Sequence, residues 1–408
     1  MTELFKAWHL SIFSLFYLGQ GYSLASLALL LPLYILNELG ARTYAESYTI
    51  SAIMLFPWYI KIVFGLISDN FPISKFGRRK PYLMIATLFS AFGWLTLGIH
   101  QTSSIYFIIS GICLAIGSAL ADTVIDALAV EITPQQYISR IQGVAWGSRG
   151  LGIGLAGIIA TQLVVKSGWL SMFYITSIFG IGISIIVLIL PEADLNPENY
   201  ISKFDLTMII LKEYLKSPKN KYRFLFFFLS GSSLAIVPLL AIIMEMEFHY
   251  SVEIIGFAAL TFAIGAFFGA ILNGILFDIK DTFSRIKLLI ISFSTIILTS
   301  LIFVFLNNII IEFSFYFLIG MTSGAFEGYQ LKVIQEETEE RLEGTIFSLW
   351  TSVSNLGQFA FGGFIIIQLA VLMKVNVLIP LQITTLFLIL CLFLIRKMKY
   401  VNLIDTEL

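Results

Sequence analysis

The sequence predicts an all-α integral membrane protein with twelve transmembrane helices in two pseudo-symmetric six-helix halves. Of the 408 residues, 58% are hydrophobic and only 12% are charged, whereas an ordinary soluble domain is roughly 45–50% apolar and about 25% charged. Long apolar runs recur at bilayer length, and the two halves of the chain resemble each other. The composition therefore excludes a soluble enzyme, and the net charge of −1 gives no attraction for nucleic acid.

Twelve apolar runs define the expected helices, because a spanning helix needs roughly 20 apolar residues. They are continuous rather than alternating, which argues against a β-barrel. The first run is too long for the apolar core of a signal peptide, so we expect an uncleaved first span. The first half contains spans 8–36, 45–67, 81–100, 103–131, 141–165 and 169–190. The second half contains spans 223–247, 254–277, 287–306, 313–333, 344–372 and 376–395.

The basic residues predict the orientation of these spans. With the N-terminus inside, 20 of the 25 Lys and Arg residues fall in inside segments and only 3 in outside loops. This bias is the positive-inside pattern, so both termini are expected in the cytoplasm. We expect the protein to lie in the plasma membrane. The segment 191–222 is expected to be a cytoplasmic linker with an amphipathic helix on the membrane surface. It divides the chain into an N-terminal half, 1–190, and a C-terminal half, 223–408.

An internal repeat supports this division. Four pairs of short motifs occur in the same order in both halves, at offsets between 203 and 209 residues. The pairs are Gly65–Asp69 with Gly274–Asp278, Ile116-Gly117 with Ile319-Gly320, Trp146 with Trp350, and Leu151-Gly152 with Leu356-Gly357. A parallel duplication of six helices is the arrangement of transporters that bind their solute between the two halves.

Several motifs carry a family resemblance. Gly65-x-x-x-Asp69, followed by Gly77-Arg78-Arg79, resembles the loop 2–3 signature of the major facilitator superfamily. The longer loop between these two pieces resembles the folate–biopterin transporter family, as do blocks at 57–61, 121–131 and 146–149. The resemblance covers roughly residues 57–152. It implies the major facilitator fold and a transporter that alternates between two access states.

Five charged residues stand out within the expected spans, where a charge at the bilayer centre costs about 2.5–3.5 kcal/mol on insertion scales. They are Lys61, Asp122, Asp126, Arg149 and Glu327. Asp122 and Asp126 are four residues apart and so share a helical face. Because two close, buried carboxylates repel, we expect one of them to hold a proton that is released during transport. The alternative is a structural anchor that pairs with Lys61 or Arg149.

The other three charges have two interpretations each. Lys61 and Arg149 are expected to lie shallowly enough to snorkel toward the cytoplasm. They could contact an anionic substrate, or act as salt-bridge partners for the aspartates. Glu327 falls at the repeat position between Asp122 and Asp126. The resemblance implies that it faces the central cavity, and the alternative is a hydrogen-bonded glutamate between helices.

A second group of residues is expected to form a gate at the cytoplasmic end. Asp69 and Asp278 are predicted to pair with Arg140, Arg78 or Arg79 when that end is shut. Glu131 and Arg140 lie at cytoplasmic helix ends, where ordinary solvation is the alternative. The motif and gate residues are Gly65, Asp69, Gly77, Arg78, Arg79, Glu131, Arg140 and Asp278.

Small residues predict where the two halves slide against each other. Span 5 has glycines at 143, 147, 150, 154 and 157, which form one continuous helical face. Span 8 has Gly265, Gly269, Ala270 and Gly274. Because glycine lets helix backbones approach closely, and spans 5 and 8 meet in the superfamily that the motifs resemble, we expect a glycine seam between these two spans.

The sequence favours a secondary active transporter over an enzyme. It contains no P-loop, no HExxH motif and no nucleophile elbow, so an ion gradient is expected to supply the energy. The expected partners are a small organic solute such as a folate-like or pterin-like anion, a coupling proton and the lipid bilayer. We expect a monomer with no cofactor and no metal. The alternatives are a muropeptide or sugar transporter, or a non-transporting membrane assembly factor on the same fold.

Overall fold

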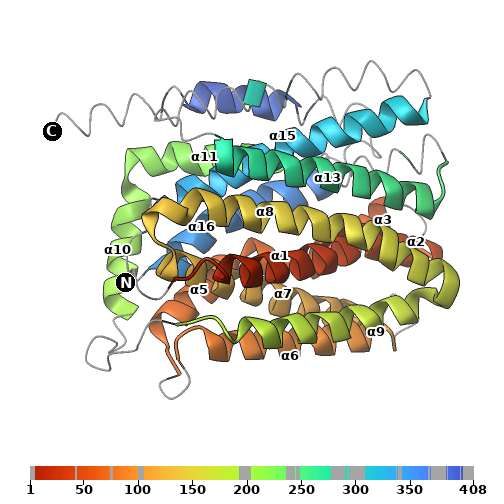
Figure 1. Ribbon diagram of the computed structural model, residues 1–408, viewed down its shortest axis with the longest axis horizontal. Helices are drawn as coiled ribbons and strands as arrows, with labels where there is room; N and C mark the ends of the chain where they lie inside the picture. The colour runs from red at the N-terminus through yellow and green to blue at the C-terminus, as the bar shows by residue number, and fades with distance from the viewer. Residues whose placement is uncertain are drawn as a thin grey trace.

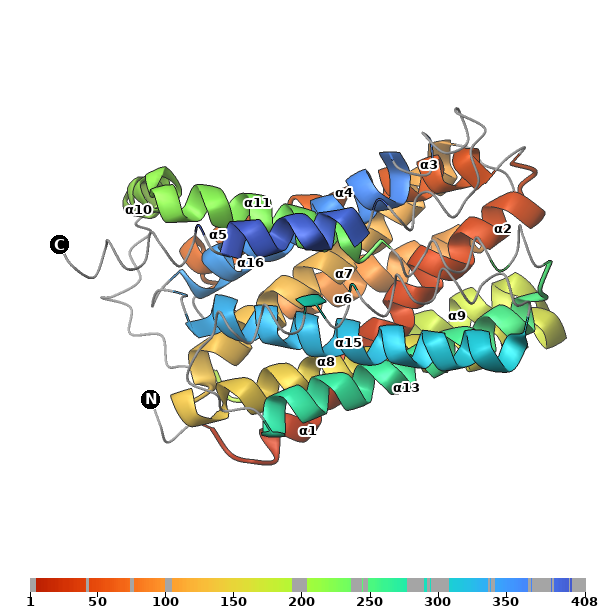
Figure 2. The same cartoon turned by 90° about the horizontal axis from the view of Figure 1, so that it is seen from above.

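The computed structural model describes most of the chain as a bundle of long helices that run along one common direction (Figure 1). The same arrangement is seen from above in Figure 2. The described residues are 5–41, 44–73, 77–99, 105–192, 204–235, 244, 249–276, 290–291, 294, 308–336, 338, 342–365, 368, 383, 385–395 and 397.

The N-terminal half contains six spans, three of which are interrupted. Span 1 consists of α1 (His9–Ala25), a π-helical turn (Ser26–Leu30) and α2 (Leu31–Asn37). Span 2 consists of α3 (Tyr44–Met54), α4 (Phe56–Tyr59) and α5 (Lys61–Asn70). Spans 3 and 4 are α6 (Lys80–Leu97) and α7 (Ile105–Ile132). Spans 5 and 6 are α8 (Ile138–Leu155), a π-helical turn (Ala156–Ala160) and α9 (Thr161–Val187), with a reversal at Gly168, whose φ is 80°.

The C-terminal half is described in part. Its helices are α11 (Pro218–Ser233), α13 (Val252–Leu276), α15 (Ile309–Glu336) and α16 (Glu343–Asn355), which continues as a π-helical segment, Leu356–Ile365. A shorter apolar helix covers Thr385–Ile395. The span expected at 287–306 lies almost wholly outside the described residues.

Five helical stretches in the described part of the chain are long and apolar enough to cross a membrane. They are His9–Asn37, Ile105–Ile132, Ile138–Val187, Glu253–Leu272 and Ile309–Gln335. The stretch Ile138–Val187 is 50 residues long and contains the reversal at Gly168, so it holds two spans. The helix bounds agree with the expected spans to within a few residues wherever both ends are described.

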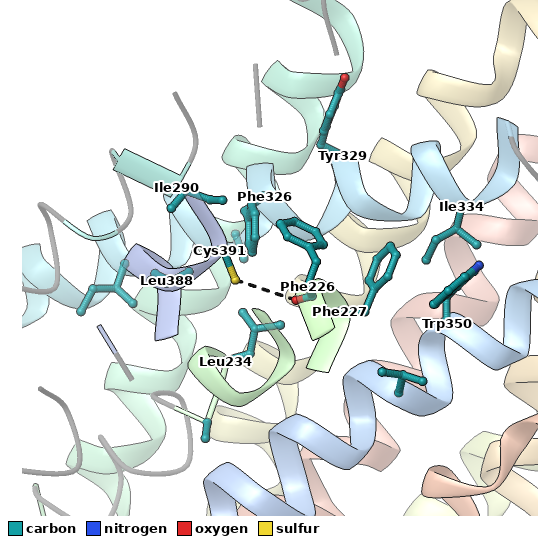
Figure 3. Packing of buried hydrophobic residues seen from close by; sticks show 14 of the residues in the cluster. Phe226, Phe227, Leu234, Ile290, Phe326, Tyr329, Ile334, Trp350, Leu388 and Cys391 are labelled. Atoms are coloured by element: carbon teal, nitrogen blue, oxygen red, sulfur yellow. Dashed lines mark hydrogen bonds between the residues drawn. The ribbon is translucent and has the colours of Figure 1, made fainter. Parts of the chain in front are cut away.

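Each half has its own apolar core. In the C-terminal half, aromatic side chains from α11, α15 and α16 pack together with the helix Thr385–Ile395 (Figure 3). The rings of Phe227 and Trp350 lie 5.3 Å apart. Cys391 is fully buried in this core, and its thiol lies 3.8 Å from the carbonyl oxygen of Phe226. Both cysteines are free, as expected.

The amphipathic helix of the linker, α10 (Phe204–Lys216), runs across one end of the bundle, transverse to the long helices (Figure 1). It contacts both halves, since Thr207 donates a hydrogen bond to Asn70 at the end of α5 (2.8 Å), while Trp350 of α16 donates one to Tyr214 (3.1 Å). This end of the molecule also contains the first residues of α6 and α16. We call it the basic end, because Lys212 and Lys216 of α10 and Arg79 and Lys80 at the start of α6 lie there.

The expected glycine seam is present on α8. A Cβ atom added to Gly154 would lie 2.7 Å from the Cβ of Ala263 on α13, and one added to Gly150 would lie 3.2 Å from the Cβ of Ala266. The tightest approach involves Gly157, where a Cβ would lie 2.5 Å from the carbonyl oxygen of Gly256. The backbones of spans 5 and 8 therefore touch across the interface between the halves.

The expected partners on span 8 are different. A Cβ at Gly265 would lie 2.0 Å from the carbonyl oxygen of Phe317, and one at Gly269 would lie 1.8 Å from that of Met321, both on α15. The expectation that these two glycines face span 5 is wrong, because they lie on the opposite face of α13 and pack it against its neighbour in the same half. Sequence spacing shows that residues share a face but not which helix lies opposite.

Replacing Gly157 with leucine is expected to force spans 5 and 8 apart, because the contact at Gly256 is with backbone that cannot rotate away. Overpacking of this kind typically costs about 1–3 kcal/mol. Gly182→Leu is the matched control, since nothing lies within 4 Å of a Cβ at this exposed position of α9. Thermal unfolding of the two variants in detergent measures the difference. Equal effects would contradict a tight seam.

Candidate substrate cavity and gate

A central cavity with a volume of about 100 Å³ lies between the two halves. Its N-terminal wall carries all four charged groups that were predicted in spans 2, 4 and 5, namely Lys61, Asp122, Asp126 and Arg149. Its C-terminal wall carries Glu327 together with amides, hydroxyls and aromatic rings. The five charged residues, which are up to 266 positions apart in the chain, therefore line one space.

Asp122 lies at the centre of the charged cluster. One carboxylate oxygen accepts a hydrogen bond from Lys61, and the other accepts one of 2.6 Å from Nη2 of Arg149. Lys61 is also 3.6 Å from the carboxylate of Asp126. Two cations thus lie against two carboxylates, which is an arrangement that can bury charge in a membrane because each group has an opposite partner.

Helix α1 contributes polar side chains that hold this cluster. Gln20 donates a hydrogen bond to Asp122 and accepts two from Arg149, at 2.9 and 2.5 Å. The hydroxyl of Tyr17 donates to Asp126 at 2.6 Å. Neither Tyr17 nor Gln20 was predicted from the sequence, although a glutamine inside the first span and a tyrosine one turn before it could have indicated a polar face on that helix.

The expectation that Lys61 and Arg149 snorkel toward the cytoplasm is wrong. Lys61 is 1% exposed and starts α5 directly after a break at Ile60, so it lies well inside the bundle. The guanidinium of Arg149 lies over the ring of Trp146, 4.9 Å from its centroid. Both cations are drawn inward by Asp122, and ring faces supply further attraction.

A second charged cluster occupies the basic end. The Nη2 atom of Arg79, a residue that is fully buried, lies 2.7 Å from Asp69 and 2.6 Å from Glu131. Arg78 lies 3.1 Å from Asp69 and 2.8 Å from Glu131. Glu343 at the start of α16 lies 3.4 Å from Arg78 and 3.6 Å from Arg79. Two guanidiniums thus bridge carboxylates from both halves.

Asp69 makes the most direct contacts between the halves in this cluster. Its carboxylate accepts hydrogen bonds from the backbone N–H of Gly344 (3.2 Å) and from the N–H and hydroxyl of Thr345 (2.7 and 2.6 Å). A carboxylate at a helix N-terminus satisfies orphan N–H donors and interacts favourably with the helix dipole. The close approach needs Gly65, where a Cβ would lie 2.3 Å from the carbonyl oxygen of Gly344.

The loop before α6 has a conformation that glycine permits. Gly77 has a φ of 102°, and a bridge pairs it with Ile73. A Cβ at Gly77 would lie 2.5 Å from the carboxylate of Glu192, which accepts hydrogen bonds from the backbone N–H groups of Arg79 and Lys80. Glu192 therefore caps α6 and was not predicted as part of the motif.

Two of the predicted gate residues are not part of this described cluster. Arg140 is exposed, with its guanidinium 5.5 Å from the ring centroid of Tyr137, so it does not pair with Asp69. Asp278 lies outside the described residues. A further contact between the halves at the basic end comes from Gln142 of α8, which donates a hydrogen bond of 2.7 Å to Gln335 of α15.

Together, the two-part helical bundle, the charged central cavity and the charged cluster around Asp69 are features of a membrane transporter fold. The family model of the Major Facilitator Superfamily matches residues 12–362. The chain belongs to the Major Facilitator Superfamily. This confirms the all-helical fold class with two six-helix halves and the superfamily that the sequence motifs resemble.

Curated relatives share the more specific resemblance. The chain is 38% identical over 119 residues to "Probable folate-biopterin transporter 4" of Arabidopsis thaliana, and 26% identical over 173 residues to "Folate-biopterin transporter" of Synechocystis sp.. These matches cover 28% and 42% of this chain but only 24% and 34% of those proteins. "Folate transporter 2" of Plasmodium falciparum is 26% identical over 376 residues, which is 85% of this chain and 77% of that protein.

Solved structures share the fold at low sequence identity. The human organic anion transporter MFSD10 (TETRAN) matches with a TM-score of 0.75 and 11% identity, over 95% of this chain and 98% of that one. A bacterial homologue of the iron transporter ferroportin, in an outward-facing state, matches with a TM-score of 0.70 and 13% identity, over 96% and 99% of the two chains. At these identities the likeness shows the fold alone.

Proposed function

We propose that the protein is a secondary active transporter that moves a small organic anion of the folate or pterin class through the central cavity by alternating access. The observation that carries the proposal is the position of Lys61 and Arg149, two buried cations that line a cavity between the halves and are held there by Asp122. The names of the relatives support the choice of substrate class.

In this proposal, the gate cluster closes one side of the cavity. Asp69, Arg78 and Arg79 join the N-terminal half to the start of α16, so the central cavity is sealed from the basic end. The cavity of about 100 Å³ is small for such a solute, so it widens when the halves 1–190 and 223–408 rock apart. The excess of basic residues in the expected inside segments supports a cytoplasmic basic end, with both termini in the cytoplasm. We place the protein in the plasma membrane as part of the same proposal.

We also propose that protons drive the transport, with Asp126 as the carboxyl that takes up the proton. Asp122 contacts both cations directly, whereas Asp126 is 3.6 Å from Lys61 and accepts a hydrogen bond from the neutral hydroxyl of Tyr17. A substrate anion that approaches Lys61 weakens its attraction for Asp126 and favours protonation there. Binding of the anion and uptake of the proton then reinforce each other.

The test is uptake of radiolabelled folic acid into proteoliposomes that contain the purified protein. A pH gradient is expected to drive accumulation by the wild type. Asp126→Asn mimics a permanently protonated site, so it is expected to retain exchange of labelled for unlabelled folic acid but to lose accumulation. Asp122→Asn is expected to lose accumulation to a lesser degree. If both variants concentrate folic acid as the wild type does, the aspartates are structural and do not couple transport to protons.

A further inference from the structure

We propose that Glu327 and Gln330 on α15 form a subsite for a heterocycle edge that presents two adjacent N–H donors beside a carbonyl acceptor. The 2-amino-4-oxopyrimidine edge of a pteridine ring has this pattern. The inference rests on the function proposed above, and it assigns the orientation of the solute between the two walls of the cavity.

The first observation is that Glu327 has no partner within the described part of the protein. Its side chain lines the cavity, and it makes no hydrogen bond or ion pair with any described residue. Arg149 lies on the opposite wall of the same cavity. An ionisable side chain within a membrane span needs a partner. A ligand that enters the cavity can supply that partner.

The second observation is the neighbouring amide. Gln330 follows Glu327 by three residues, so the two side chains project from the same face of α15. Gln330 is 5% exposed, and its amide nitrogen is buried without a hydrogen-bond partner among the described residues. The subsite therefore offers two carboxylate oxygens that accept and one amide group that donates.

The donors and acceptors of these groups complement those of the pteridine edge in kind and number. A carboxylate accepts two parallel N–H bonds in a fork geometry, here from the exocyclic amino group and the adjacent ring N–H. The next position on the ring is a carbonyl oxygen, which accepts from the amide of Gln330. A site built from such buried polar groups rejects a ligand that leaves them unpaired.

The rest of the cavity fits the remainder of the same solute. Phe227, Phe262 and Phe359 come from three different helical segments of the C-terminal half and line the same cavity, to which they can offer apolar ring surfaces. Lys61 and Arg149 lie on the N-terminal wall, where an acid group at the other end of the solute would be attracted. The bound molecule thus connects the two halves, with its ring on the C-terminal wall and its acid on the N-terminal wall.

The experiment compares two ligands that differ at one position. Pterin-6-carboxylate has the 2-amino group, whereas lumazine-6-carboxylate has an oxo group there, which would turn a carbonyl oxygen toward Glu327. Equilibrium binding to the purified full chain in detergent is expected to favour the pterin acid by about 10- to 100-fold. Glu327→Gln is expected to lose most of that preference. Gln330→Met is expected to weaken both ligands by a similar factor, about tenfold, because both retain the 4-oxo group.

Glu312→Gln is the matched control, because it removes a second buried carboxylate from α15 outside the cavity lining. It is expected to retain the wild-type preference. Thermal unfolding establishes that each variant is folded. Equal affinity of the wild type for the two acids, with folic acid still bound, would overturn the subsite and leave the proposed function standing. A preference that survives Glu327→Gln would also overturn it. If neither acid nor folic acid binds, the proposed substrate class is wrong, and the subsite fails with it.

Discussion

Replacing Asp69 with asparagine is expected to open the basic end of the bundle. The carboxylate accepts from the start of α16 in the C-terminal half and contacts both Arg78 and Arg79 in its own half. An amide keeps one acceptor but loses the charge that holds the two guanidiniums against α16. Hydrogen bonds to charged groups contribute about 1.5–3 kcal/mol each, so we expect the population of the open state to rise about 10- to 100-fold.

The measurement is the rate at which a polar maleimide labels a cysteine inside the cavity. Ile334→Cys places the reporter at a cavity-lining position that is 3% exposed, in a background in which Cys113 and Cys391 are replaced by alanine. The Asp69→Asn variant is expected to label at least about tenfold faster than the parent. Glu213→Gln is the matched control, because Glu213 is an exposed carboxylate on α10 at the same end of the molecule. Unchanged labelling of folded Asp69→Asn protein would refute the gate.

Much of the fold follows from the sequence because membrane insertion imposes simple rules. A span needs a minimum length of apolar residues, and its ends need polar or basic groups. The bounds of α7 and α15 therefore lie close to the expected runs at 103–131 and 313–333. The lengths of the apolar runs do not predict the breaks inside spans 1 and 2, which lie at the π-helical turn Ser26–Leu30 and at Ile60. The local signals are Pro32 and Pro57, each in the first turn of a short helix beside a break.

The candidate site was predictable in its charged members but not in its geometry. Charged residues within spans are rare enough that Lys61, Asp122 and Arg149 could be selected directly from the sequence. Their depth could not, because a long side chain reaches either toward water or toward a buried partner depending on tertiary contacts. Gln20 was not predicted, because the candidate residues were selected by their charge and a glutamine side chain is neutral.

The partner of Asp69 in the C-terminal half could not be predicted from the sequence either. The Gly65, Asp69 and Gly77 motif predicted a gate on the loop after span 2, but the partner of Asp69 in the other half is backbone at the start of α16, together with Thr345. Any helix start presents free N–H groups, so no particular residue type marks this partner. Glu343 lies beside it as part of an acidic helix start. Only the tertiary arrangement brings these groups to Asp69.

The charge pair at the centre of the cavity can be tested by removing one member and then both. Arg149→Met leaves Asp122 and Gln20 without the guanidinium that they share, and loss of one partner of a buried ion pair typically costs about 3–5 kcal/mol. We expect a large drop in the yield of folded protein and in the unfolding temperature in detergent. Uptake of folic acid by the remaining protein is expected to be abolished.

The double variant Arg149→Met/Asp122→Asn separates the structural role of Arg149 from its role in binding. It leaves Lys61 beside Asp126, so the cluster remains neutral overall. It is expected to recover most of the stability lost in the single variant, because no carboxylate is left without a cation. Uptake is expected to stay absent, since the substrate anion loses the guanidinium on the cavity wall. Restored uptake would show that Arg149 only balances Asp122, and a double variant as unstable as Arg149→Met would show that the two residues are not energetically paired.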